Sequence, residues 1–101
     1  MLINIYVTFP NLKTAKKIAS VLLKKRLIAC VNFFPIKSNY WWQGKIVKDS
    51  EIMAIYKTSS KNWLKVQREI KKRHSYTVSA IEKIEVKTDE NYERWVKEVT
   101  R

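Results

Sequence analysis

One nine-residue stretch constrains the fold more than any other part of the chain, because it carries large aromatic rings on both of its faces. Residues 38–46 read SNYWWQGKI and contain the only glycine and two of the four tryptophans. Neighbouring side chains of a strand point to opposite faces, so Tyr40 and Trp42 share one face and Trp41 lies on the other. Each such ring buries roughly 200 Å², and leaving it in water forgoes up to about 5 kcal/mol. The stretch therefore predicts a long hairpin arm whose rings are covered by another copy of the chain.

Hydrophobic periodicity predicts a strand and a helix in the first quarter of the chain. Residues 2–9 alternate between two sets, one of which is entirely apolar, as expected of a strand with a buried inner face. Asn11 is a suitable N-cap for a helix that runs to about Arg26. The apolar stripe of this helix comprises Leu12, Ala15, Ile18, Ala19, Leu22 and Leu23.

Two further strands form the predicted hairpin. The apolar run over residues 27–34 is typical of a buried strand, and Pro35 then implies a bulge, a bend or an edge position. The strand resumes through the aromatic stretch, and Gly44 reverses the chain with a positive φ. The return strand covers residues 45–58, with a polar kink at residues 48–50.

The last third of the chain predicts a helix, a strand and a second helix. Ser59 or Ser60 caps the first of these helices, and residues 76–87 form the fourth strand. Thr88 or Asp89 caps the final helix. The buried stripes of the two helices are Trp63, Leu64, Val66 and Ile70 in the first, and Tyr92, Trp95, Val96 and Val99 in the second.

The order of elements predicts the fold class. Strand, helix, strand, strand, helix, strand is the βαββαβ order of the ferredoxin-like α+β sandwich, here with an extra C-terminal helix. Residues 1–101 then form one domain with its helices on one face of an antiparallel sheet. The other face would be bare in a monomer, which favours a covering by further subunits.

The net charge of +12, from 21 Lys and Arg against 9 Asp and Glu, raises the possibility of nucleic-acid binding. Most of the basic residues fall on the predicted outer faces of helices, which favours a solvated lysine-rich surface. Nonspecific nucleic-acid binding is kept as the alternative function, because the hairpin interleaves aromatic and basic residues that could stack on single strands.

Several sequence features favour a cytoplasmic protein. Cys30 is the only cysteine and cannot form an intrachain disulfide, as suits a reducing compartment. The N-terminus does not resemble a signal peptide, and the apolar runs are too short to span a bilayer. We expect no membrane association.

Six short motifs spread along the whole chain occur in a characteristic order and spacing: Thr8-Phe9-Pro10, KRLIACVN at residues 25–32, YWWQGKI at residues 40–46, Glu51 with Lys57-Thr58, His74-Ser75-Tyr76, and Tyr92-Glu93-Arg94-Trp95. In these motifs the chain resembles the CutA family of divalent-cation tolerance proteins, which is related in fold to the PII signalling proteins. The resemblance implies a homotrimer with Tyr40, Trp41 and Trp42 at the subunit contacts, and a role in divalent-cation tolerance without catalysis.

The resemblance also implies copper or another divalent metal as a ligand. The ligands proposed in relatives fall here on Val7, Arg73 and His74, so only His74 carries over. Cys30 could add a thiolate, although a cysteine in an apolar strand usually packs as a small hydrophobe. Tight soft-metal sites use three or four nitrogen or sulfur ligands, so no cofactor is assigned with certainty. The chain further departs from its relatives at Ser75, Ser79 and Glu82.

A cleft between subunits is the second candidate site that the resemblance implies, formed by Glu51, Lys57, His74 and Tyr76. Lys57 could bind an anion there, and His74 could titrate near neutral pH. The structural alternative pairs Lys57 with Glu51 and leaves His74 at a helix end, where a cation suits the dipole.

An enzymatic function has little support in the sequence. A single glycine excludes a P-loop and a dinucleotide fingerprint, and a Cys30–His74 dyad has no evident third member.

Overall fold

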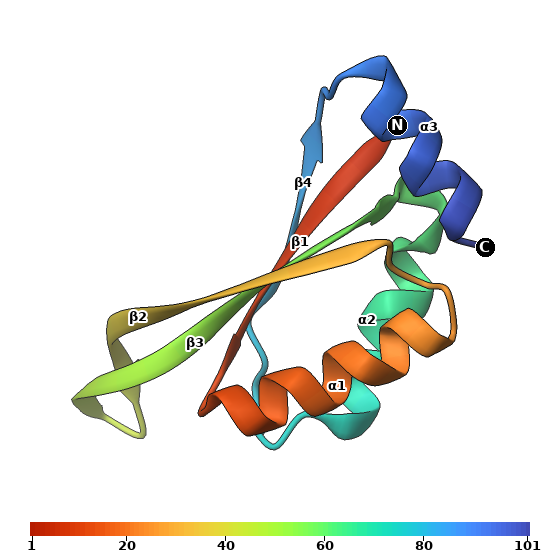
Figure 1. Cartoon of the computed structure of the whole chain (residues 1–101). Helices are drawn as coiled ribbons and strands as arrows, with labels where there is room; N and C mark the ends of the chain where they lie inside the picture. The colour runs from red at the N-terminus through yellow and green to blue at the C-terminus, as the bar shows by residue number, and fades with distance from the viewer.

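Four antiparallel strands form one sheet, and two helices pack on one of its faces (Figure 1). The computed structural model describes all of residues 1–101, and its strands lie in the order β2-β3-β1-β4. This is the predicted ferredoxin-like α+β fold with a third helix at the C-terminus. The elements are β1 (Leu2–Phe9), α1 (Leu12–Lys24), β2 (Cys30–Trp42), β3 (Lys45–Ser59), a 3₁₀ turn (Ser60–Asn62), α2 (Trp63–Arg73), β4 (Ile81–Val86) and α3 (Glu90–Val99).

The core lies between this sheet face and the helices α1 and α2. The predicted inner set of β1, from Ile3 to Phe9, is fully buried. It packs with Ala54 and Tyr56 of β3 and with apolar residues of both helices. The helix residues in this core are Ala15, Ile18, Ala19, Leu22, Val66 and Ile70. None of the three helices has the length and apolarity needed to cross a membrane.

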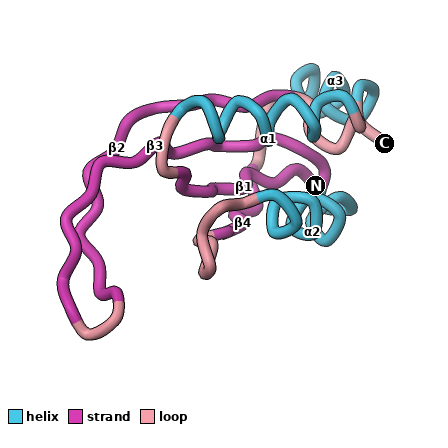
Figure 2. Tube along the Cα trace, turned by 90° about the horizontal axis from the view of Figure 1, so that it is seen from below, coloured by secondary structure: helices cyan, strands magenta, loops and turns pink.

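The predicted hairpin is present, and its outer half extends beyond the rest of the sheet. Pairing of β1 with β3 ends at Phe9 opposite Ile52, whereas β2 and β3 stay paired out to Trp42 opposite Lys45. The arm of residues 36–51 therefore lacks a third strand, and Figure 2 shows it reaching away from the helices. The extents of 45 × 24 × 21 Å reflect this projection.

The turn at the tip of the arm has the predicted geometry. Gln43 and Gly44 have φ values of 50° and 77°, as in the type I′ turn that suits a two-residue hairpin. The polar kink expected at residues 48–50 is absent, because these residues keep their pairing with residues 37–39. Pro35 likewise causes no bulge and lies opposite Ile52. Of the three options, the edge position is correct, since β2 is an outer strand.

Several predicted element ends need correction. Helix α1 ends at Lys24 rather than near Arg26, which takes the left-handed conformation with φ 56°. A 3₁₀ turn precedes α2, whose N-cap is Asn62 rather than Ser59 or Ser60. Leu64 falls off the buried stripe of α2 and is 65% exposed. The predicted caps Asn11 and Asp89 are confirmed by side-chain hydrogen bonds to the first turns of their helices.

Strand β4 begins five residues later than predicted. Its last pair with β1 joins Ile81 to Val7. Beyond that pair the carbonyl of Thr8 is bonded by the ring of His74, 2.7 Å from Nε2. A side chain therefore replaces strand pairing there, and residues 76–80 form a loop.

The sheet face opposite α1 and α2 remains partly open. Phe34 and Ile84 are exposed, and Tyr6, Met53 and Ile55 are only half-buried. On the arm, Trp41 is 72% exposed and Ile46 is also exposed. The chain thus buries most of the apolar residues on its helix-covered face but leaves this face and the arm without cover.

Candidate functional site

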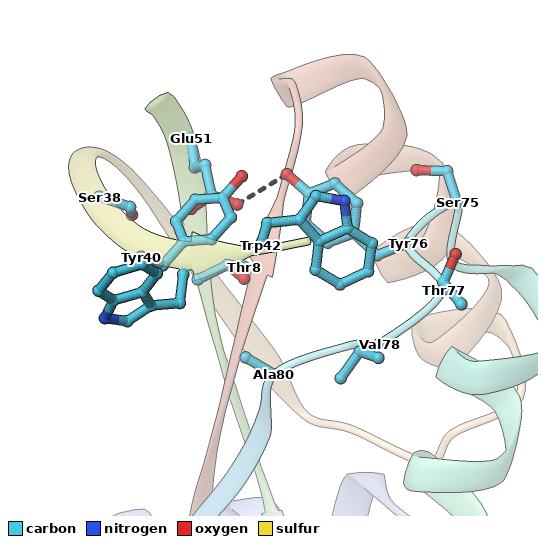
Figure 3. A pocket seen from close by; sticks show the side chains of 11 residues that line it. Thr8, Ser38, Tyr40, Trp42, Glu51, Ser75, Tyr76, Thr77, Val78 and Ala80 are labelled. Carbon is cyan, nitrogen blue, oxygen red and sulfur yellow. Dashed lines mark hydrogen bonds between the residues drawn. The ribbon is translucent and has the colours of Figure 1, made fainter. Parts of the chain in front are cut away.

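A cleft of about 620 Å³ lies beside the hairpin arm. Its walls come from the arm, from the end of β1 and from the loop between α2 and β4 (Figure 3). The arm contributes Tyr40, Trp41 and Trp42 from β2 and Glu51 from β3, and the loop contributes Tyr76. Because the outer half of the arm has no third strand, the loop can lie close to its aromatic side chains.

Glu51 and Tyr76 form the polar centre of the cleft. The Tyr76 hydroxyl donates a hydrogen bond of 2.7 Å to Oε2 of Glu51. Burial, and then this bond to a carboxylate, raises the pKa of Tyr76 above its ordinary value, so the phenol stays protonated as a donor. Glu51 is only 7% exposed, and none of the ion pairs in the chain includes it.

His74 fastens the loop to β1. Its Nδ1 accepts a hydrogen bond of 3.1 Å from the backbone N–H of Tyr76, so Nε2 carries the proton and donates to the Thr8 carbonyl. The ring also stacks on Phe9, with centroids 4.6 Å apart and an interplanar angle of 6°. Both ring nitrogens therefore have partners, and His74 holds Tyr76 at the cleft.

A second phenol–carboxylate pair lies on the arm next to the first. The Tyr40 hydroxyl donates to Oδ2 of Asp49 over 3.1 Å. Burial and the carboxylate of Asp49 raise the pKa of Tyr40. No lysine or arginine lines the cleft, although the chain has 21 of them. The site is thus aromatic and acidic in a strongly basic protein.

The other predicted site residues lie elsewhere. Cys30 and Lys57 are paired with each other, and Lys57 lies opposite Asn4 of β1. The ring of His74 bonds to the carbonyl of Thr8. Thr8 lies four residues after Asn4 on β1, or roughly 13 Å from it. One chain therefore does not bring Cys30 or Lys57 to His74. It contains no group of three or more His, Cys, Asp or Glu residues that could hold a metal ion.

The predicted pairing of Lys57 with Glu51 is also wrong, since six residues of an extended strand separate them by roughly 20 Å. Glu51 and Tyr76 do come together within one chain, through the hydrogen bond of the Tyr76 hydroxyl.

Asp49 was not among the predicted site residues, and Tyr40 was assigned only to subunit contacts. The two-residue turn at Gly44 fixes the register of the arm, so Ser38 lies opposite Asp49. Alternation from that pair places Tyr40, Trp42, Asp49 and Glu51 on one face. The turn signal was therefore sufficient to group these four side chains.

Three comparisons relate the chain to known proteins. The family model described as CutA1 divalent ion tolerance protein matches residues 3–99. Divalent-cation tolerance protein CutA of Pyrococcus horikoshii is 43% identical over 101 residues, which cover 99% of each chain. The protein of the same name from Archaeoglobus fulgidus is 51% identical over 77 residues, or 76% of each chain. A solved structure described as the periplasmic divalent cation tolerance protein CutA of Archaeoglobus fulgidus matches with a TM-score of 0.96 at 43% identity, covering 98% of each chain.

Proposed function

The chain belongs to the CutA1 family of divalent ion tolerance proteins, and from this premise we propose that it serves divalent-cation tolerance as a non-catalytic homotrimer. The observation that carries the proposal is the open sheet face together with the projecting arm. Three copies with their open faces inward would cover Phe34, Ile55 and Ile84, and each arm would lay Trp41 on a neighbour. Covering this apolar area provides the driving force for assembly.

The mass in solution tests the assembly. We expect light scattering to give three times the chain mass of 12.1 kDa at micromolar concentration. A mass equal to that of one chain would overturn the proposal, because the open face and the arm would then be stable in water.

The relatives are named for divalent-cation tolerance, so a divalent metal such as copper is the first ligand to test. The residues of a single chain do not fit such a site: Cys30 lies far from His74, and both nitrogens of His74 already have partners. A metal would need donors from more than one subunit. Calorimetric titration of the trimer with Cu(II) and with Zn(II) tests this, and binding weaker than about 10 µM for both metals would remove a dedicated metal site.

A small anion is poorly matched to the cleft. The carboxylates of Glu51 and Asp49 lie at or next to it, and no basic side chain lines it. Lys57 remains available to an anion elsewhere on the open sheet face, where a neighbouring subunit would have to complete the site.

The absence of catalysis is supported by the lack of an activated nucleophile. Cys30 has no histidine beside it, and His74 is committed to Thr8 and Tyr76. We also propose a cytoplasmic location, which the unpaired Cys30 favours. One related structure is described as periplasmic, so cell fractionation of the tagged protein would decide between a cytoplasmic and a periplasmic location.

Nonspecific nucleic-acid binding is the alternative function, and the basic charge of two helices is the observation that supports it. Helices α1 and α2 carry nine lysines and arginines against one acidic residue, Glu69. Such a surface binds phosphates with a strong salt dependence. A gel shift that persists near physiological salt would support this alternative. Elution from heparin at low salt, with no gel shift, would exclude it.

A further inference from the structure

We propose that the outer face of helices α1 and α2 binds the phosphate backbone of double-stranded nucleic acid. This basic face comprises the exposed lysines and arginines of residues 11–26 and 60–74. The inference takes further the alternative function, nonspecific nucleic-acid binding, and rests on it. Helices α1 and α2 cover the sheet face opposite the open one (Figure 1), so the proposed homotrimer leaves the basic face in solvent.

The first argument is the separation of charge within the chain. Twelve lysines and arginines lie on the basic face against one acidic residue, Glu69, and all twelve are exposed. The rest of the chain carries nine basic and eight acidic residues, so eleven of the twelve net positive charges lie on the basic face. A surface that serves solubility alone intersperses the two signs, as α3 does with three acidic and two basic residues. A single-sign field of this size attracts a polyanion.

The second argument is that most of this charge has no partner within the chain. Glu69 forms ion pairs with three of the twelve basic side chains, and the other nine take part in none of the ion pairs of the chain. Like charges also lie one turn apart on both helices, where they destabilise a helix. Lys13 and Lys17 form such a pair in α1. Arg68 and Lys72 form another in α2, and the phosphates of a ligand would offset both repulsions.

The third argument is the spacing of the charges. The 13 residues of α1 extend over about 20 Å, and the ion pair between Lys25 and Glu69 joins the end of this helix to α2. A duplex presents one phosphate per about 1.7 Å of its axis, or about twelve over 20 Å, whereas one strand presents about half as many. Nine unpaired basic side chains on two adjacent helices therefore match the phosphates of a duplex better than those of a single strand.

The competing polyanions fit the basic face less well. Proteins bind single strands by stacking the bases on exposed aromatic rings. The basic face offers no such ring, because Trp63 packs against the core and carries Lys83 over its face. Helices that bind a bilayer insert an apolar face, whereas the apolar faces of α1 and α2 are buried in the core. A duplex needs neither feature, because its bases are already stacked and its phosphates lie outside.

The experiment titrates the intact protein into a fluorescently labelled DNA duplex of about 20 base pairs, and into one of its strands alone, and measures anisotropy. We expect the duplex to bind at least about tenfold more tightly than the single strand, because its phosphates are about twice as dense. Raising the salt concentration from about 50 to 200 mM should weaken duplex binding about 1000-fold or more, as for six or more phosphate contacts. Vesicles of phosphatidylserine and phosphatidylcholine should not displace the duplex.

Two matched double variants locate the binding. Lys17→Gln with Arg68→Gln removes one lysine and one arginine from the basic face, and we expect duplex binding to weaken at least about tenfold, with a smaller salt dependence. Lys87→Gln with Arg94→Gln is the control, because it removes the same two residue types at exposed positions outside the basic face. Its affinity should stay within about threefold of that of the unmodified chain, because salt screens charges outside the contact.

The outcomes separate this inference from the functions proposed above. Binding of neither nucleic acid would refute the alternative function and this inference with it, and would leave the homotrimer standing. Binding that is equal for duplex and single strand, or that both double variants weaken equally, would overturn the inference alone. Displacement of the duplex by the vesicles would overturn it in favour of a membrane surface. If the variant of the basic face fails to fold, the comparison of duplex with single strand on the unmodified chain still decides.

Discussion

Replacing Trp41 by alanine measures how much free energy assembly gains from the hairpin arm. The ring is 72% exposed in the single chain, so folding of one subunit buries little of it. A tryptophan side chain buries about 150 to 250 Å², of which about 110 to 180 Å² is still available for a neighbour to cover. At about 25 cal/mol per Å², this area is worth about 3 to 4.5 kcal/mol per subunit.

The assay is the mass of the protein over a dilution series, combined with urea unfolding at two protein concentrations. A loss of about 3 to 4.5 kcal/mol weakens each contact by about 140- to 1600-fold, so Trp41→Ala should dissociate at concentrations where the unmodified trimer is intact. The urea midpoint of an assembled protein depends on protein concentration. At each of the two concentrations, we expect the midpoint of the Trp41→Ala variant to differ from that of the unmodified chain.

Leu64→Ala is the matched control. Leu64 is also highly exposed, at 65%, but it lies on α2, away from the open sheet face. Its truncation should change neither mass nor stability by more than about 0.5 kcal/mol, as for most surface substitutions. A Trp41→Ala variant that stays trimeric on dilution with unchanged unfolding would refute the assignment of Trp41 to a subunit contact.

Three further predictions concern single features. Thr58→Val should lower the free energy of unfolding by about 1 to 3 kcal/mol in urea titration, because the buried carbonyl of Leu27 loses the 2.7 Å hydrogen bond from the Thr58 hydroxyl; an unchanged midpoint would contradict this. Bonds from neighbouring lysine and arginine lower the pKa of Glu69 from 4.5 to about 2, so its stabilisation is present above pH 4.5 and is lost as the pH falls towards 2. Glu69→Gln should therefore flatten the dependence of the free energy of unfolding on pH between about pH 2 and 4.5, whereas Glu85→Gln should leave that dependence unchanged. Gly44→Ala should cost only about 1 kcal/mol, since φ is +77° but no atom lies within 4 Å of the added methyl group, and the mass should not change.

Local signals account for the parts of the fold that were predictable from the sequence. Asn11 and Asp89 act as helix caps because their short side chains reach the backbone of the next turn. Gly44 reverses the hairpin because it tolerates a positive φ. Alternation in β1 identified the buried face, since only one of its two sets is wholly apolar.

Contacts between distant residues explain what could not be predicted. The alternation of Tyr76, Val78 and Ala80 suggests a strand, but His74 occupies the Thr8 carbonyl and pairing stops at Ile81. That competition joins residues 66 positions apart. The cleft itself depends on where the loop between α2 and β4 meets the arm, and hydrophobic periodicity contains no information about that distance.

Pro35 also has a consequence for aggregation. Strand β2 is 13 residues long and forms an outer edge of the sheet, and a long unprotected edge is a template for fibril growth by strand addition. Proline has no N–H to donate, so a foreign strand cannot form an unbroken ladder along this edge. Lys37, two residues further on, adds a charge on the same edge strand. The long hairpin can thus present many aromatic rings to a neighbour while its backbone resists open-ended polymerisation.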